Sequence, residues 1–129
     1  MEVLVFGNRL YGGDIAALDV ADALRGMPGV EFVECDTAED IERYGPNLVI
    51  LDTAIGIDRV VLLDGVDKIE KAKPYSMHDF DLGIMLRLLL KAKKIVSVAI
   101  IAVPAHYDRE KGADEAKKLL TSILSSGSA

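Results

Sequence analysis

The chain has 129 residues, half of them hydrophobic, and its 21 acidic and 15 basic side chains give a net charge of −6 at pH 7. This length predicts a single domain, residues 1–129, with enough apolar side chains for its own core. The negative charge argues against non-specific binding to nucleic acid or to an anionic membrane. The single cysteine, Cys35, excludes an intramolecular disulfide and favours a reducing compartment, so we expect a cytoplasmic protein.

No segment has the length of a membrane span. The longest apolar stretches, 82–90 and 95–103, are separated by lysines, whereas a span needs about 20 apolar residues. The first residues lack a basic segment and lead directly into an apolar run, so no signal peptide is expected.

The hydrophobic pattern predicts strands and helices that alternate along the chain. Short apolar runs are typical of buried strands, and apolar residues with helical spacing are typical of helices. In chain order the pattern predicts a strand at 3–7, a helix from Asp14 to Pro28, a strand at 30–35, helical turns at 38–44, a central strand at 48–51, a small hairpin or bulged strand at 59–63 and 68–71, a loop at 74–79, a helix at 80–92, a strand at 95–103 and a helix at 113–124. This order predicts an α/β fold of three layers, a mostly parallel twisted sheet with helices on both faces, in a phosphorylase/peptidyl-tRNA-hydrolase-like or flavodoxin-like architecture.

The helix expected at 80–92 is apolar on nearly all sides, with Arg87 and Lys91 as its main polar residues. Such a helix needs neighbours that cover most of its surface. We therefore expect a packing element, and not a membrane or partner anchor.

A glycine-rich turn, Gly7-Asn8-Arg9-Leu10-Tyr11-Gly12-Gly13-Asp14, follows the first strand. In a parallel sheet such a turn lies at the carboxyl edge, where ligands bind. Its glycines do not have the G-x-G-x-x-G spacing of dinucleotide-binding proteins, and a carboxylate at the helix start would repel phosphate. From these residues alone, the favoured role of Asp14 is a helix N-cap.

Asp52 ends the predicted central strand, at the same edge of the sheet as Asp14. It has a simple explanation as a cap or turn residue. Two acids at neighbouring strand ends, however, are also a candidate acid/base or metal-binding pair.

Two histidines compete for a place beside these acids. His78, in Ser76-Met77-His78, precedes the apolar helix, and His106 follows the last strand. A lone histidine in a loop is more often a surface or capping residue than a ligand. Ser76 and His78 are too close in sequence to suggest a hydrolase triad, no Gly-x-Ser-x-Gly motif is present, and nothing near Cys35 would activate its thiol. Enzyme classes with a side-chain nucleophile are therefore poorly supported.

Taken together, the segments 7–14, 48–52 and 76–78 resemble the motifs of the hydrogenase maturation proteases, endopeptidases that trim the C-terminus of the large subunit of nickel–iron hydrogenases. That family has Gly-Asn-x-Leu-x-x-Asp and a second acid after its first strand, an aspartate after a Val/Ile-rich strand, and a Ser/Thr-x-His loop before a helix. It also has a strand ending in Gly-Ile-x-Pro, which Ile101-Ala102-Val103-Pro104 partly matches. The resemblance covers nearly the whole chain in the right order.

The resemblance implies that Asp14, Asp52 and His78 form a metal site and are the catalytic residues, and we hold His106 as a reserve ligand. It also implies that nickel arrives already bound in the hydrogenase large-subunit precursor, whose C-terminal extension is then removed. Two carboxylates and an imidazole are acceptable ligands for nickel or zinc. Activation of water by the metal and an aspartate acting as general base both stay open as mechanisms.

The chain departs from the family pattern at several places, among them Ile15 in place of a glycine and a missing Pro-Gly-Thr segment around 58–63. Gly13 stands where the family has the first of its paired acids, and Glu34-Cys35-Asp36-Thr37 lacks the glycine of the family's Asp-x-Gly-Thr segment, which is thought to face the substrate. A non-catalytic chaperone of hydrogenase assembly is therefore one alternative, and a flavodoxin-like or nucleotide-binding module is another. We expect a monomer with no nucleic-acid or membrane partner.

Overall fold

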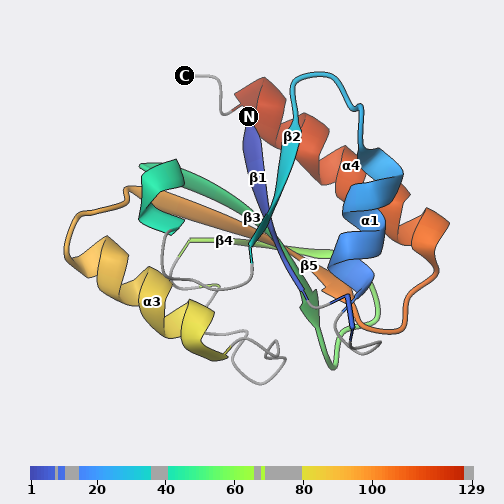
Figure 1. Cartoon of the computed structure of the whole chain (residues 1–129), viewed down its shortest axis with the longest axis horizontal. Helices are drawn as coiled ribbons and strands as arrows, with labels where there is room; N and C mark the ends of the chain where they lie inside the picture. The colour runs from blue at the N-terminus through green and yellow to red at the C-terminus, as the bar shows by residue number, and fades with distance from the viewer. Residues whose placement is uncertain (8, 11–14, 36–40, 66–67, 69–79, 127–129) are drawn as a thin grey trace.

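The structure is a computed structural model that describes residues 1–7, 9–10, 15–35, 41–65, 68 and 80–126, with backbone only for 80–83. These residues form an α/β fold around a five-stranded sheet with the strand order β2-β1-β3-β5-β4 (Figure 1). The strands are β1 (Glu2–Phe6), β2 (Glu31–Cys35), β3 (Asn47–Ala54), β4 (Val61–Asp64) and β5 (Ser97–Pro104). The helices are α1 (Ala16–Leu24), the 3₁₀ helix η2 (Ile41–Tyr44), α3 (Phe80–Lys91) and α4 (Arg109–Ser126). The predicted α/β class and the mostly parallel sheet are confirmed.

Strand pairing places β3 at the centre of the sheet. β1 pairs in parallel with β2 and with β3, and β3 pairs in parallel with β5 over its whole length. The segment at 59–63, expected as one arm of a small hairpin or as a bulged strand, contributes β4, which pairs antiparallel with β5 through partners such as Leu62 and Ile101. Apart from Lys68, the other predicted arm lies outside the described residues.

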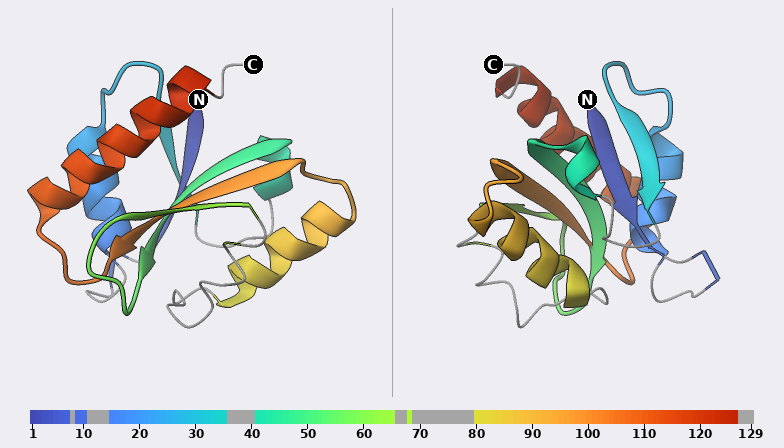
Figure 2. Two further views of the ribbon diagram at one scale, coloured as in Figure 1. Left: turned by 180° about the vertical axis from the view of Figure 1, so that it is seen from behind. Right: turned by 60° about the vertical axis from the view of Figure 1, so that its left-hand side comes forward.

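The two faces of the sheet carry separate hydrophobic cores, because side chains alternate along each strand. Figure 2 shows α1 and α4 on one face and α3 on the other. On β3, Val49 and Leu51 belong to the core under α1 and α4, whereas Leu48 and Ile50 belong to the core that includes Leu86 of α3. The same alternation directs Thr53 toward α1 and Asp52 toward the face that α3 covers.

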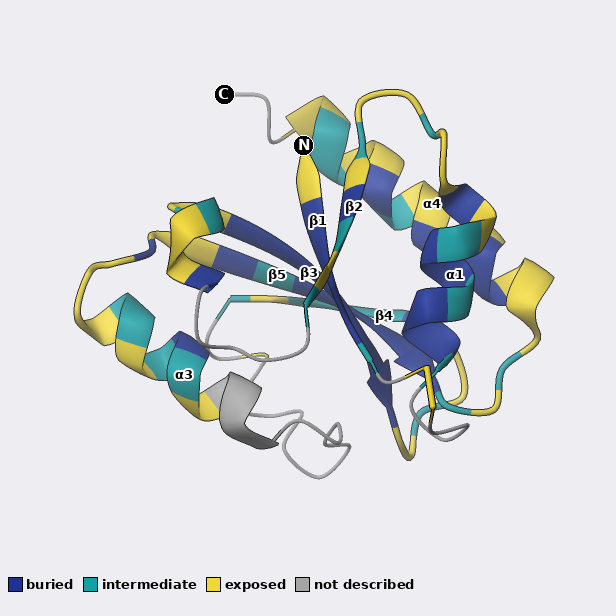
Figure 3. Ribbon diagram, in the orientation of Figure 1, coloured by how far each residue is buried: buried dark blue, intermediate teal, exposed yellow. Residues whose placement is uncertain are grey.

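Helix α3 is covered on fewer sides than its composition predicts. Leu86 is 1% exposed and packs in the core, so the helix is a packing element as expected. Ile84 and Leu88, however, are 44% and 57% exposed, and the expectation that most of the helix surface is covered is wrong for these positions (Figure 3). The physical reason is that α3 lies on the outside of the sheet, where only one side of the helix meets the strands. No helix among the described residues is long and apolar enough to cross a membrane.

Candidate active site at the carboxyl edge of the sheet

The order of the strands marks where a ligand would bind. β1 has β2 on one side and β3 on the other, so the chain changes direction across the sheet between β1 and β3. In open α/β sheets, ligands bind at such a switch point, outside the carboxyl ends of the strands. Here those ends are Phe6 of β1 and Ala54 of β3.

Asp52 lies close to this switch point but inside β3. The strand continues to Ala54, so the expectation that Asp52 ends the strand is corrected. The continued pairing of β3 with β5, which joins Asp52 to Ala102 and Thr53 to Val103, explains the extra length. Asp52 is 1% exposed, and its Oδ1 accepts a hydrogen bond from the Thr53 backbone N–H at 2.9 Å. Asp52 and Thr53 are the buried polar side chains of the part of the chain that the structure describes.

Thr53 connects this strand to the beginning of α1. Its Oγ1 accepts a hydrogen bond at 3.0 Å from the backbone N–H of Ala17, in the first turn of the helix. The first N–H groups of a helix lack partners within the helix, so Thr53 satisfies one of them from the sheet. The N-cap residue is Ile15, which has no capping side-chain hydrogen bond, and Asp14, which was expected to cap the helix, lies outside the described residues.

The other sequence-predicted ligands are placed as follows. Asp14 and His78 lie outside the described residues, and Asp14 directly precedes Ile15 in the sequence. His106 is exposed and follows β5 on the same edge of the sheet. Within the described ranges, no group of His, Cys, Asp and Glu side chains could hold a metal ion.

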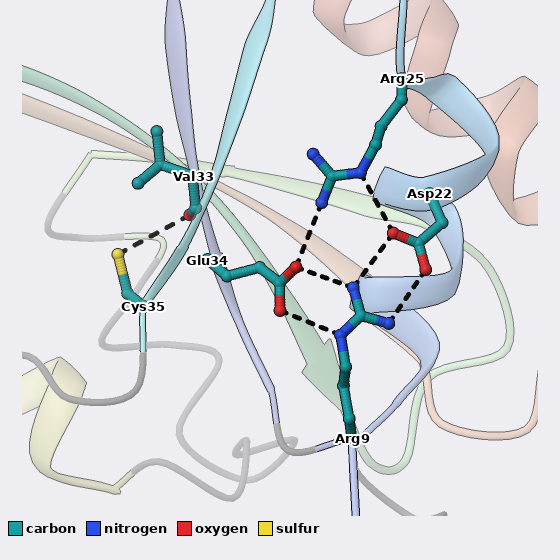
Figure 4. Close-up of polar contacts among 6 residues, drawn as sticks. All are labelled: Arg9, Asp22, Arg25, Val33, Glu34 and Cys35. Atoms are coloured by element: carbon teal, nitrogen blue, oxygen red, sulfur yellow. Dashed lines mark hydrogen bonds and ion pairs between the residues drawn. The ribbon is translucent and has the colours of Figure 1, made fainter.

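Sequence reasoning missed a cluster of charged residues beside the turn that follows β1 (Figure 4). The Arg9 guanidinium donates bidentate hydrogen bonds to two carboxylates. The distances are 3.0 and 2.8 Å to Glu34 on β2, and 3.0 and 3.1 Å to Asp22 on α1. Arg25 donates to the same two carboxylates at 3.2 Å. The Arg9 guanidinium lowers the pKa values of Asp22 and Glu34, and these carboxylates in turn raise the pKa of Arg9. Only the spacing of Asp22 and Arg25 on one helix was visible in the sequence.

A second polar contact fixes the segment between β3 and β4. Glu115 on α4 accepts hydrogen bonds from the Val60 backbone N–H at 3.1 Å and from the Tyr107 hydroxyl at 2.6 Å. The bond to the Glu115 carboxylate raises the pKa of Tyr107 to about 12, and it lowers the pKa of Glu115. Cys35 is half-buried, and its thiol donates to the Val33 carbonyl at 3.7 Å.

Comparison with known proteins identifies the fold. No protein-family model and no curated protein sequence matches the chain. The structure is similar to a [NiFe] hydrogenase maturation protease, HybD from Thermococcus kodakarensis, with a TM-score of 0.69 and 22% identity over 95% of this chain and 99% of that one. It is also similar to a hydrogenase 2 maturation peptidase from a Thaumarchaeota archaeon, with a TM-score of 0.59 and 20% identity over 96% and 98% of the two chains. An endopeptidase from Escherichia coli has a TM-score of 0.61 and 14% identity over 98% and 94%. The chain therefore has the fold of the hydrogenase maturation proteases.

Proposed function

We propose that the chain is an endopeptidase of hydrogenase maturation, which removes the C-terminal extension from a nickel-loaded large-subunit precursor of a [NiFe] hydrogenase. The observation that carries the proposal is Asp52, a buried carboxylate on the central strand at the switch point of the sheet. A buried carboxylate is costly, and functional sites are where such costs are commonly retained. The similarity in fold to hydrogenase maturation proteases over nearly the whole chain also supports the proposed endopeptidase function.

Asp14, Asp52 and His78 are the residues that would engage the nickel of the substrate. Asp14 precedes the N-cap Ile15 of α1 in the sequence, and the Thr53–Ala17 hydrogen bond ties the first turn of α1 to the residue next to Asp52. Two carboxylates and one imidazole are donors that nickel accepts, and they leave positions for ligands from the precursor. Bound nickel would supply Lewis-acid polarisation of the scissile carbonyl or of water. Asp52 in its ionised form would accept a proton from the attacking water.

The test compares nickel-loaded precursor, metal-free precursor and unrelated peptides as substrates of the purified protein. We expect a size shift only for the nickel-loaded precursor, with loss of its C-terminal peptide by mass spectrometry. The sequence has no serine or cysteine nucleophile with an assignable base, so the unrelated peptides should stay intact. Cleavage of metal-free precursor at a comparable rate would contradict the proposal.

A non-catalytic assembly chaperone is the second candidate, and Gly13 in place of the family's first acid favours it. Such a protein would bind the precursor without shortening it. A stable complex with nickel-loaded precursor that shows no size shift over hours would therefore support the chaperone function and contradict the endopeptidase function. We also propose that the protein acts in the cytoplasm as a monomer.

A further inference from the structure

The loop between β3 and β4, residues 55–60, is attached to the rest of the fold at both ends. At its start, the Ala105 backbone N–H donates a hydrogen bond to the Ala54 carbonyl at 2.9 Å, which joins the end of β3 to the residue after β5. At its end, Val60 is buried in the core under α1 and α4, and its N–H donates to Glu115 on α4 at 3.1 Å. The loop therefore leaves and re-enters the fold at fixed points.

Glu115 connects this loop to the segment that follows β5. Its Oε1 accepts the Val60 N–H, while its Oε2 accepts the Tyr107 hydroxyl at 2.6 Å. Tyr107 also packs against the core under α1 and α4, and the Lys111 ammonium lies 5.5 Å from the centre of its ring. Hydrogen bonds to an ionised carboxylate are among the stronger ones in proteins. One carboxylate on α4 thus holds together the chain segments that leave two neighbouring strands, β3 and β5, at the carboxyl edge.

The loop presents an apolar side chain to solvent beside the candidate site. Ile55 is the first residue after β3, three residues beyond Asp52, and it is 57% exposed, whereas residues 48–54 are buried. Gly56 has a φ of 87°, which other residues rarely adopt, so the chain turns directly after Ile55. A single exposed apolar residue is ordinary on a protein surface. Ile55 differs in that a loop with fixed ends carries it, at the edge of the sheet where ligands bind.

We propose that the loop 55–60 belongs to the substrate-binding surface, with Ile55 as the contact for an apolar side chain of the precursor and Glu115 as the positioning residue that holds the loop. This inference rests on the proposed function, in which the C-terminal segment of the precursor reaches Asp52 at this edge. Three residues of strand span about 10 Å, so Ile55 would meet a side chain two or three residues from the scissile bond. An apolar side chain fits this position, because a polar one would lose water against Ile55 without gaining a hydrogen bond.

The first comparison replaces one exposed apolar residue at each edge of the sheet. Ile55→Ser should raise both the Kd and the KM for nickel-loaded precursor about five- to ten-fold, because it removes apolar area that the substrate covers. Its kcat should stay unchanged, since the contact acts in binding. Val96→Ser is the matched control. Val96 is 72% exposed but precedes β5 at the opposite edge of the sheet, so its Kd and KM should equal those of the wild type.

The second comparison tests whether Glu115 acts through the loop. Glu115→Ala should speed amide hydrogen exchange in peptides covering residues 55–60 and raise the Kd about three-fold, because Ile55 is no longer held in one position. Glu115→Gln should restore both, since its amide oxygen accepts the Val60 N–H and its amide nitrogen donates to the Tyr107 oxygen. Asp114→Ala removes a charge from an exposed neighbouring position on α4 and should change neither. Combining Glu115→Ala with Ile55→Ser should raise the Kd no further than Ile55→Ser alone.

Wild-type Kd and KM in Ile55→Ser would overturn the inference and leave the proposed function in place. Equal losses in Ile55→Ser and Val96→Ser, or additive losses in the double variant, would also overturn it, because the effects would then come from general stability. If the wild-type protein binds the precursor without cleaving it, the endopeptidase function fails, while the Kd comparison still decides whether Ile55 contacts the precursor. If it neither binds nor cleaves the precursor, the proposed function and this inference both fail.

Discussion

Thr53 is the residue that joins the central strand to the helix beside the candidate site. Its side chain is fully buried, and its Oγ1 accepts the Ala17 N–H. Thr53→Val keeps the shape but leaves a buried N–H without its acceptor. We expect the free energy of unfolding to fall by about 1–3 kcal/mol, measured by urea denaturation.

Two further variants separate the hydrogen bond from other effects of the change at Thr53. Thr53→Ser keeps the hydroxyl and should keep the larger part of the stability that Thr53→Val loses. Thr121→Val removes a hydroxyl from an exposed position on α4 and should change stability by less than about 0.5 kcal/mol. Equal stability of Thr53→Val and the wild type would show that Ala17 needs no partner from the sheet.

Tyr107 predicts a pH-dependent contribution to stability. Its hydrogen bond to Glu115 raises the pKa of Tyr107 to about 12, so the folded state favours the protonated phenol. This contribution is fully present below the pKa of an unfolded tyrosine, about 10, and is lost as the pH rises through the folded value. The Tm difference between the wild type and Tyr107→Phe should therefore be constant from pH 7 to 9 and shrink between about pH 10 and 12. A difference that grows over the latter range would contradict this assignment.

At the residue scale, the sequence drew attention to individual residues but did not indicate which distant residues form contacts with each other. Asp52 was singled out because a carboxylate after an apolar run is conspicuous, and the structure buries it. The Arg9 cluster was not singled out, because Arg9, Asp22 and Glu34 meet only after β1, α1 and β2 have packed. Asp14, expected to cap α1 because it precedes the apolar pattern, lies outside the described residues. The N-cap of α1 is Ile15, and the Ala17 N–H in the first turn donates to Thr53 Oγ1, a partner that the sequence did not indicate.

At the element scale, α3 shows how composition overstates burial. Its apolar residues suggested a helix covered nearly all round, but Leu88 is 57% exposed while Leu86 is 1% exposed. Helical periodicity places these two residues on different sides of the helix, and the sequence does not say which side meets the sheet.

The two leucines provide a matched pair for testing this orientation. Leu86→Ala should lower the free energy of unfolding by about 2–5 kcal/mol, because it leaves a cavity in the core. Leu88→Ala, at an exposed position, should lower it by less than about 0.5 kcal/mol. Chemical denaturation of both variants measures the difference, and similar losses would mean that the orientation of α3 is wrong.

The edge strand β4 shows a second limit at this scale. Its apolar residues predicted extended structure correctly, and Asp64-Gly65 suggested a small hairpin or a bulged strand, whose second arm lies outside the described residues apart from Lys68. β4 pairs with β5, a long apolar strand, in a register that runs from Val61 opposite Ala102 to Asp64 opposite Ala99. The local turn signal does not contain this distant partner.

At the scale of the whole molecule, the alternation of strands and helices was sufficient to predict a mostly parallel sheet with helices on both faces. The strand order was not predictable, because it depends on contacts between residues far apart in the chain. That order creates the switch point between β1 and β3, and hence the position of the candidate site. The location of the candidate site is therefore a property of the topology, while Asp52 could be named as a candidate from the sequence alone.

In the proposed function, Asp52 engages the nickel of the precursor at the carboxyl edge of the sheet together with Asp14 and His78. The most direct test is the rate of cleavage of nickel-loaded precursor by Asp52→Asn, with Asp64→Asn as its matched control. Asp64 is an exposed aspartate at the end of β4, opposite Ala99 of β5 and away from the carboxyl edge. Circular dichroism of each variant verifies that the fold is retained.

We expect the cleavage rate to depend on whether the substituted residue belongs to the proposed nickel site. Asp52→Asn is expected to cut about a hundred-fold more slowly or not at all, as are Asp14→Asn and His78→Ala, whereas Asp64→Asn and His106→Ala cut like the wild type. Loss of cleavage in His106→Ala with full activity in His78→Ala would transfer the imidazole role to His106. Wild-type cleavage by a folded Asp52→Asn would contradict the account.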